Sequence, residues 1–401
     1  MNQVFYGFPR PVGRAGIRNK ILLLPIDRYS NEAAWQIDQT VAGLTRFTCP
    51  GDMGRHAGDR ERLFSIMRGV AANPNVAGVV LISVNREFNY PETRAQRLLD
   101  ALAALEKPVV PLFMSELGGA ARTVVEGQIA ARNLLREIGR QQRCPVPLGE
   151  LSIGIKCGTS DGTSGISGNP ALGAAMDRLV AANGTVIFSE TTEIIGAEQV
   201  LAERAADAQT AERIVCMARR VERQARDLGE DIRTINPIPS NIKAGISTLE
   251  EKSLGAIAKG GTTPLCGALD YAQAPDRRGL FFMDGWMASN SLPISLAAAG
   301  AQITVLQSGG SDLPDDPPLA ATNPGLVAPN FYMSGNPELV AKMRVGLDFD
   351  SSAVLVGDES LADIGARILQ ALSEIASGQP TYGETLKYSE VQEIWFDGPV
   401  F

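Results

Sequence analysis

NVAGVVLIS, at residues 75–83, is the stretch that decides the fold of this chain of 401 residues. It is an apolar run rich in Val, Leu and Ile, which is typical of a strand buried on both faces of a parallel sheet. KILLLPI at residues 20–26 and PVVPLF at residues 108–113 repeat the pattern. Helical patterns alternate with these strands at residues 31–45, 59–71 and 92–106. The alternation predicts a Rossmann-like α/β domain built on a parallel sheet.

A second α/β unit follows a segment that carries prolines. QQRCPVPLGE, at residues 141–150, interrupts the periodic pattern and marks a boundary. We therefore predict a Rossmann-like domain at residues 1–145 and a larger α/β catalytic domain at residues 146–401. Within the second unit, the pattern predicts strands at 184–190, 279–283 and 302–306 and helices at 172–182, 198–228 and 360–376.

Composition excludes several classes of protein. The chain has 44% hydrophobic and 20% charged residues, as a soluble globular protein does. Its net charge of −8 argues against a nucleic-acid binder, which carries a basic surplus. No apolar run approaches the ~18 residues of a membrane helix, and the N-terminal residues lack a signal-peptide layout. We expect a cytoplasmic protein with no membrane or nucleic-acid partner.

The cysteines and the histidine narrow the chemistry. The chain has 5 cysteines, scattered without a CxxC motif, which predicts reduced thiols and no cysteine-only zinc site. His56 is the one histidine, so sites that need a pair of histidines are excluded. A Ser-His-Asp hydrolase would have to use His56 alone. No GxGxxG motif follows the first predicted strand, where a dinucleotide-binding protein needs it.

The densest polar segment is GIKCGTSDGTSGISGNPALG, at residues 154–173. Glycines let backbone N–H groups approach a ligand closely, and polar side chains between them supply directional contacts. An ordinary surface connection is the alternative, but long loops in compact domains are usually functional. The segment predicts a site for a small anionic molecule, with these candidate residues: Lys156, Cys157, Ser160, Asp161, Ser164 and Asn169.

Carboxylates follow two of the predicted strands. Glu190 and Glu193 lie in SETTE, and Asp284 lies in FFMDGW. Carboxylates at strand ends can hold a divalent cation or act as acid and base. For SETTE the alternative is a helix start, with a threonine as cap and Glu193 favourable to the helix dipole.

NIKAGISTLEEKSLGAIAKGG, at residues 241–261, combines lysines with glycine turns. Pairing of Glu with Lys on an amphipathic helix explains part of this pattern. Asn241, Lys243, Lys252 and Lys259 are further candidates, because lysines suit a multiply anionic substrate and a desolvated lysine can act as a base.

These motifs resemble the altronate/galactarate dehydratase family, and the resemblance runs essentially end to end. GFPRPVGRAGIRN (7–19) is similar to the opening motif of the family, and LPIDRYSNEAA (24–34) resembles its sulfo-lyase branch. The motifs KCGTSD…SGISGNPALG, SETTEIIGAE, NIKAGISTLEEKSLGAIAKGG and FFMD are also similar to family motifs.

The resemblance implies β-elimination from a small 2-hydroxy acid. A base removes the C2 proton, water or sulfite leaves C3, and the enol relaxes to a 2-oxo acid. A divalent metal (Mg, Mn or Fe) is implied to stabilise the enediolate. Many members carry a small N-terminal domain that this sequence lacks, which implies a separate small subunit or its loss. We also expect a homo-oligomer.

Roles are assigned to the candidate residues on this basis. The expected catalytic residues are Lys156, Asp161, Glu193 and Lys252. Glu190 and Asp284 are the expected metal ligands. The expected substrate-binding residues are Cys157, Ser160, Ser164, Asn169, Asn241, Lys243, Lys259 and His56.

The sequence also departs from the family pattern. TCPGDMGRHAGD (48–59) and SVNRE (83–87) lack the cysteines of the sugar-acid dehydratases, as the sulfo-lyase branch does. QSGGSDLPDD (307–316) replaces an arginine or glutamine by Gly310 and adds Asp312, Asp315 and Asp316. We expect a substrate other than altronate or galactarate. The alternatives are an isomerase or epimerase that uses the same proton abstraction, and a catalytically silent binding subunit.

Overall fold

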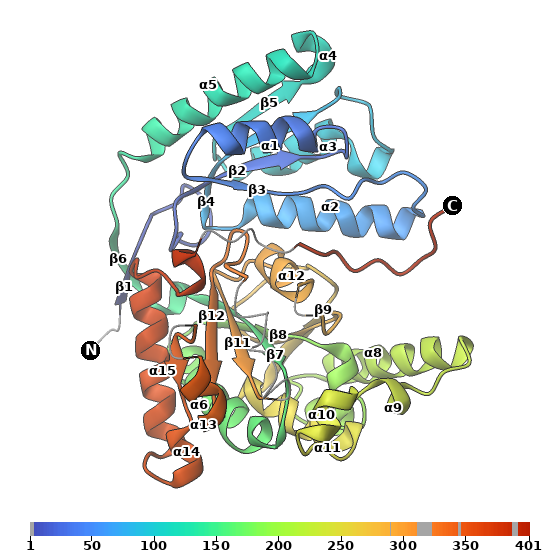
Figure 1. The fold of residues 1–401 in the computed structure, drawn as a ribbon, viewed down its shortest axis with the longest axis vertical. Coiled ribbons are helices and arrows are strands. Elements are labelled where there is room, and N and C mark those ends of the chain that lie inside the picture. Colours follow the sequence, from blue (N-terminus) through green and yellow to red (C-terminus); the bar gives the residue numbers. More distant parts are fainter. Residues whose placement is uncertain (1–3, 289, 311–322, 344–345, 387–391) are drawn as a thin grey trace.

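A computed structural model describes residues 4–288, 290–310, 323–343, 346–386 and 392–401. Asp312, Asp315 and Asp316, which the sequence analysis singled out, lie outside the described residues. Within the described part, the chain is a mixed α/β protein with two parallel sheets (Figure 1). The predicted fold class is confirmed.

The smaller sheet has the strand order β3-β2-β4-β5, and all of its pairs are parallel. Its strands are β2 (Lys20–Pro25), β3 (Leu44–Arg46), β4 (Val76–Ser83) and β5 (Val109–Phe113). Its helices are α1 (Asn31–Thr40), α2 (Ala57–Ala72), α3 (Ala95–Ala103), α4 (Met114–Leu117) and α5 (Ala120–Ile138), with a 3₁₀ turn at Pro91–Thr93. Leu22 and Leu24 pack on one face while Ile21 and Leu23 pack on the other, so helices cover both faces.

The larger sheet has the strand order β13-β12-β11-β7-β8-β10-β9 and is also parallel. Its strands are β7 (Ser152–Gly158), β8 (Thr185–Phe188), β9 (Leu265–Leu269), β10 (Gly279–Met283), β11 (Ile303–Ser308), β12 (Asn330–Ser334) and β13 (Phe349–Asp350).

Its helices are α6 (Asn169–Ala181), α7 (Glu198–Ala202), α8 (Ala208–Asp227), α9 (Ile232–Ile235), α10 (Pro239–Lys243), α11 (Leu249–Ile257), α12 (Leu292–Ala298), α13 (Pro337–Lys342), α14 (Ala353–Val356) and α15 (Leu361–Ala376). Short turns complete the unit: a π-helical turn at Ser164–Gly168 and 3₁₀ turns at Leu148–Glu150, Thr191–Glu193, Ala258–Gly260 and Gly383–Thr385. None of the helices in the described part of the chain is both long and apolar enough to cross a membrane.

Two predicted helices differ from those observed. The predicted helix at 31–45 ends at Thr40, because Leu44–Arg46 pairs with β2 as a short edge strand. The predicted helix at 198–228 is interrupted after Ala202, since Ala205 forms a bridge with Leu265. The side chain of Asp207 then caps α8 by accepting the N–H of Thr210 at 2.7 Å.

Both ends of the described chain pack away from the sheet nearest to them in sequence. Val4–Gly7 (β1) pairs with Cys144–Pro147 (β6), in which the predicted boundary at 145 falls, and Phe5 belongs to the core of the larger sheet. Residues 394–396 return to pack against the core of the smaller sheet, where the C-terminal segment runs beside α2 (Figure 1). The two sheets are therefore tied together at both ends of the chain.

Buried asparagines also join the two sheets, at the turn between α2 and β4. Asn73 Nδ2 donates to the carbonyls of Ala297 and Ala301, each at 2.8 Å. Asn75 Nδ2 donates to the carbonyl of Gln302 at 2.8 Å. Gly69 allows this approach, because a Cβ there would lie 2.2 Å from the carbonyl oxygen of Ala298. Satisfied polar groups therefore fix how α2 packs on α12.

A buried ion pair secures the region between the sheets. Arg18 donates to both carboxylate oxygens of Glu384, at 2.8 and 2.7 Å, and to the carbonyl of Ile375 at 2.9 Å. The side chains of Arg18 and Glu384 are 12% and 15% exposed. Burial raises the pKa of Glu384, but Arg18 outweighs this effect and holds the pKa below its ordinary value.

We expect Glu384→Gln to lower the free energy of unfolding by about 3 kcal/mol at pH 7, because it leaves Arg18 buried without its partner. The folded-state pKa of Glu384 is depressed, so this stabilisation is fully present above the ordinary pKa of 4.5 and is lost as the pH falls through the folded value. Urea unfolding at pH 7, 5 and 4 measures the difference. Glu359→Gln is the matched control, since its partner Arg367 is 54% exposed, and we expect a change below about 0.5 kcal/mol. Equal effects of the two variants would contradict the argument.

Candidate active site

The candidate site lies where β7 and β8 end, in the middle of the larger sheet. These strands are parallel neighbours, so their carboxyl ends meet at one edge. Cys157 lies at the end of β7, and Glu190 and Glu193 follow β8. This is the edge at which parallel α/β sheets bind ligands.

Glu190 is fully buried among cationic and amide partners. Its Oε2 accepts the N–H of Cys157 at 3.0 Å and binds Nζ of Lys259, while its Oε1 lies 3.3 Å from Nζ of Lys156. Its φ of 83° lies in the left-handed region, which residues other than glycine rarely adopt. A buried carboxylate is stable only with such partners, so they hold this strained turn in place.

Glu193 forms the second centre of negative charge. Its Oε1 lies 3.0 Å from Nζ of Lys252, and its Oε2 lies 3.9 Å from Nζ of Lys259. Lys252 Nζ also donates to Asn236 Oδ1 at 2.8 Å and to Asn241 Oδ1 at 3.1 Å. Because an ammonium has three N–H groups, Lys252 is fully engaged by these acceptors. It is a fixed positive charge in the resting site.

The surroundings of Glu193, Lys252 and Lys259 favour the charged form of each of these three groups. Burial raises the pKa of Glu193, but Lys252, Lys259 and Lys156 outweigh it and hold the pKa at about 2. Burial lowers the pKa values of Lys252 and Lys259, but nearby carboxylates reverse the effect and the pKa of each lies above its ordinary value. Glu193, Lys252 and Lys259 are therefore preformed charges at neutral pH.

Cys157 contacts both halves of the cluster. Its Sγ lies 3.1 Å from Oγ of Ser160 and 3.4 Å from Oε2 of Glu193. Burial, followed by the charge of Glu193, raises the pKa of the thiol to about 12. The thiol is therefore a weak hydrogen-bond donor to Glu193 within this set of charges.

Cys157, Glu190 and Glu193 also form a buried group that can hold a metal ion. Each offers one ligand atom, and these atoms lie within 4.8 Å of one another. One sulfur and two carboxylate oxygens suit manganese or iron better than magnesium, which prefers oxygen alone. The lysines already bound to the carboxylates compete with a cation, so an ion must displace at least one ammonium from its carboxylate.

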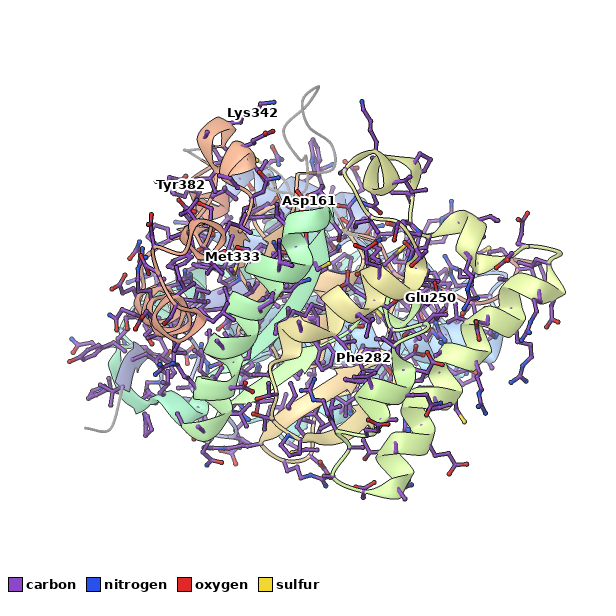
Figure 2. All side chains as sticks on the ribbon, turned by 90° about the horizontal axis from the view of Figure 1, so that it is seen from below. Asp161, Glu250, Phe282, Met333, Lys342 and Tyr382 are labelled. Atoms are coloured by element: carbon purple, nitrogen blue, oxygen red, sulfur yellow. The ribbon has the colours of Figure 1, made fainter. Side chains whose placement is uncertain are left out.

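Asp161 organises the loop that follows β7 (Figure 2). Its Oδ1 accepts the N–H groups of Thr163 and Ser164, each at 3.0 Å. Its Oδ2 accepts the N–H of Gly310 at 2.8 Å and Nδ2 of Asn336 at 2.6 Å. Both oxygens are therefore occupied by donors of the protein, which favours a positioning role over the catalytic role expected from the sequence.

Two cavities flank the cluster and share a wall of Cys157, Ser160 and Lys252. The first, of about 220 Å³, is lined by these residues together with Lys156, Gly158, Thr159, Glu193, Ile238, Asn241, Trp286, Met287 and Ala288. The second, of about 200 Å³, is lined instead by loop and α11 residues, Ser164 and Asn169 among them. Asn169 Nδ2 donates to the carbonyl of Gly255 at 3.0 Å, which fixes that wall. Both cavities are small and polar on one side, as a small acid requires.

Other predicted residues lie apart from this cluster. Lys243 is exposed at the end of α10 and lines a third cavity of about 550 Å³, beyond Asp161. His56 caps α2 on the smaller sheet, where its Nδ1 accepts the N–H of Gly58 at 3.1 Å. Asp284 follows β10, and both of its carboxylate oxygens bind Arg220. The structure thus brings together the loop after β7, SETTE, Asn241, Lys252 and Lys259. Lys243 and His56 lie outside this group, and Asp284 contacts it through Thr191 rather than through Glu190 or Glu193.

Sequence reasoning missed some contributors to the site. Asn236 binds Lys252, and Asn336 binds Asp161, yet neither lies in a segment that the sequence analysis singled out. The Asn236-Pro237 dipeptide was the available signal for the first, because such dipeptides mark turns. Asn336 lies far along the chain, and only the adjacency of β11 and β12 brings it near.

Known proteins are similar in sequence to nearly the whole chain. Residues 7–139 match the second domain of D-galactarate dehydratase/altronate hydrolase, and residues 148–399 match the D-galactarate/altronate dehydratase C-terminal domain. The (2R)-sulfolactate sulfo-lyase subunit beta of Chromohalobacter salexigens is 32% identical over 390 residues, which cover 97% of this chain and 96% of that protein.

Sugar-acid dehydratases are also similar. Altronate dehydratase of Bacillus subtilis is 30% identical over 406 residues, which cover 97% of this chain and 77% of the relative. Galactarate dehydratase of Escherichia coli is 29% identical over 318 residues, or 78% of this chain and 58% of the relative. The family expected from the sequence motifs is confirmed. This chain belongs to the D-galactarate/altronate dehydratase family of lyases.

Proposed function

We propose that the chain catalyses β-elimination from a small 2-hydroxy carboxylate to give a 2-oxo acid. The observation that carries the proposal is the buried cluster of lysines and glutamates beside a cavity of about 220 Å³. Removal of the C2 proton leaves an enediolate, and fixed positive charges stabilise such an anion without reorganising. Fixed charges of this kind are what the cluster provides.

The substrate carboxylate binds in this first cavity, against Lys156. In the described structure Lys156 donates to the carbonyl of Cys157 and to Glu190. An ammonium has three N–H groups, so one remains for a bound anion. Asn241 and Ser160 line the same cavity and orient the substrate hydroxyl. The substituent on C3 lies toward the second cavity, with Ser164 and Asn169.

Glu193 is the base in this proposal. Its Oε2 lies 3.4 Å from the thiol of Cys157 and 3.9 Å from Nζ of Lys259, whereas Oε1 lies 3.0 Å from Nζ of Lys252, so Oε2 is the more weakly bound oxygen. In the resting site its pKa of about 2 makes it a weak base. A substrate carboxylate bound beside it raises the pKa of Glu193, because like charges disfavour ionisation. Substrate binding thereby prepares its own base.

A divalent cation, manganese or iron, is the proposed cofactor. Cys157 and Glu190 would hold it, which leaves Glu193, the third member of this group, as the base. When bound, it would polarise the carboxylate and 2-oxygen of the substrate. Lys156, Lys252 and Lys259 neutralise the carboxylates of Glu190 and Glu193, and they also orient the substrate. Asp284, which lies outside this group, is not proposed as a ligand.

The proposed substrate is a 2-hydroxy acid of three to six carbons, sulfolactate among them. The small cavities favour a short acid, and a relative covered almost end to end is named for sulfolactate. That relative is a subunit beta, which supports a separate small subunit as a partner of this chain. Homo-oligomerisation and a cytoplasmic location stay predictions from the sequence.

We expect Glu193→Gln to lower kcat at least about 100-fold, because the amide cannot accept the C2 proton. Lys156→Met should instead raise KM at least about tenfold, since it removes a charge that binds the substrate carboxylate. Release of a 2-oxo acid from sulfolactate and a panel of 2-hydroxy acids measures both effects.

Glu250→Gln is the matched control for these variants. Glu250 lies on α11, pairs with Arg233 and is 41% exposed (Figure 2), so the variant should keep wild-type kinetics. Wild-type kcat in Glu193→Gln would disprove its role as base. A product with the mass of the substrate and altered stereochemistry would show that the chain is an isomerase and not a lyase.

The substrate panel is run both with and without the candidate small subunit, because the chain alone can be inactive if it requires that partner.

Metal binding is tested without turnover. We expect the chelator-treated chain to bind Mn²⁺ saturably in calorimetric titrations, and Cys157→Ser and Glu190→Gln each to weaken binding at least about tenfold. Glu251→Gln is the control, because Glu251 lines the second cavity but lies outside the ligand group. Equal affinity in all four proteins would show that the ion binds elsewhere.

A further inference from the structure

Arg220 lies on α8 and reaches the active-site turn through one intermediate side chain. Its guanidinium donates to both oxygens of Asp284, at 2.7 and 2.8 Å. The side chain of Asp284 is 6% exposed, so Arg220 is a charged hydrogen-bonding partner for a carboxylate with little access to water. The paired, two-pronged geometry fixes the orientation of the carboxylate as well as its charge.

Asp284 in turn holds Thr191, which directly follows Glu190 and lies two residues before Glu193. Thr191 Oγ1 donates to Asp284 Oδ1 at 2.7 Å and accepts the N–H of Gly285 at 3.1 Å, while the Thr191 N–H donates to the carbonyl of Gly285 at 3.0 Å. Glu190 precedes Thr191 and has the left-handed φ of 83°. A strained residue persists only where its surroundings determine its conformation. Here the hydrogen bonds of Thr191 with Asp284 and Gly285 connect the residue after Glu190 to the end of β10.

The other side of Arg220 faces the C-terminal segment. Its guanidinium carbon lies 5.5 Å from the ring centre of Trp395, and that of Arg62, on α2, lies 4.3 Å from the same ring. The backbone N–H of Trp395 donates to the hydroxyl of Tyr271 at 3.2 Å, and the two rings meet edge to face. The ring of Trp395 therefore lies near one cationic side chain from each sheet unit, Arg220 from the larger and Arg62 from the smaller.

We propose that Arg220 is a positioning residue for the active site, which holds Glu190 and Glu193 through Asp284 and Thr191, and that Trp395 couples this support to the smaller sheet. In this proposal Asp284 orients the turn that carries Glu190 and Glu193. The inference rests on the proposed function only for its kinetic readout, because the position of the turn is measurable without a substrate.

The first experiment is hydrogen–deuterium exchange on the full chain. We expect Arg220→Gln to speed exchange in peptides that span residues 189–194 by about tenfold. Peptides of β11 and α15 should keep wild-type rates. Arg213→Gln is the matched control on the same helix, since Arg213 pairs with Asp270 at 2.8 Å and Asp270 is 77% exposed. Unchanged exchange at 189–194, or equal loosening of all peptides, would overturn the inference.

A second variant guards against loss of folding in Arg220→Gln. Thr191→Val removes only the hydroxyl that binds Asp284, and it should loosen the same peptides. Trp395→Ala should give a smaller change that does not add to the change in Arg220→Gln, because the two side chains act in one path. Additive effects would remove Trp395 from the proposal.

Kinetics supply the remaining readout. We expect Arg220→Gln to lower kcat about 10- to 100-fold with KM unchanged, and Arg220→Lys to recover part of the loss. Wild-type kcat in Arg220→Gln would overturn the positioning role even if exchange were altered. If the wild-type chain releases no 2-oxo acid, the proposed function fails while the exchange experiment still decides the role of Arg220.

Discussion

The burial of the Glu190 carboxylate is the constraint on which the site depends. A charge without water must be neutralised by groups that arrive from elsewhere in the fold. Here the N–H of Cys157 comes from β7, Lys156 from the same strand, and Lys259 from the turn after α11. The order of strands in the larger sheet makes this meeting possible, because β7 and β8 are neighbours. By binding Glu190, these partners fix the position of β7 and of the turn after α11 relative to the segment that follows β8.

The same constraint explains why the site is electrostatically stiff. Lys252 uses its donors on Glu193, Asn236 and Asn241, and Asp161 is filled by donors from the loops around it. Groups held in this way do not reorient when a substrate arrives, which lowers the cost of forming a new charge.

The sequence singled out most of the residues that the structure brings together, although their roles stay predictions. Lys156 and Cys157 came from the glycine-rich segment 154–173, Glu190 and Glu193 from SETTE, and Lys252 and Lys259 from the lysine-rich segment 241–261. Periodicity could not show that Lys243 points to solvent, because α10 is too short to have a recognisable buried face. It also could not separate β3 from α1, since Leu44–Arg46 becomes a strand only by pairing with β2. Long-range contacts such as Asn336 with Asp161 leave no local signal.

The exchange of chain ends between the sheets has a consequence for synthesis of the protein. Ile394, Trp395 and Phe396 complete the packing around the smaller sheet, whose strands are all made before residue 114. Phe5 and Ile17, made first, belong to the core of the larger sheet. A nascent chain therefore carries an uncovered apolar face through most of translation. The smaller sheet reaches its final packing only after residues 394–396 have been synthesised, long after its own strands.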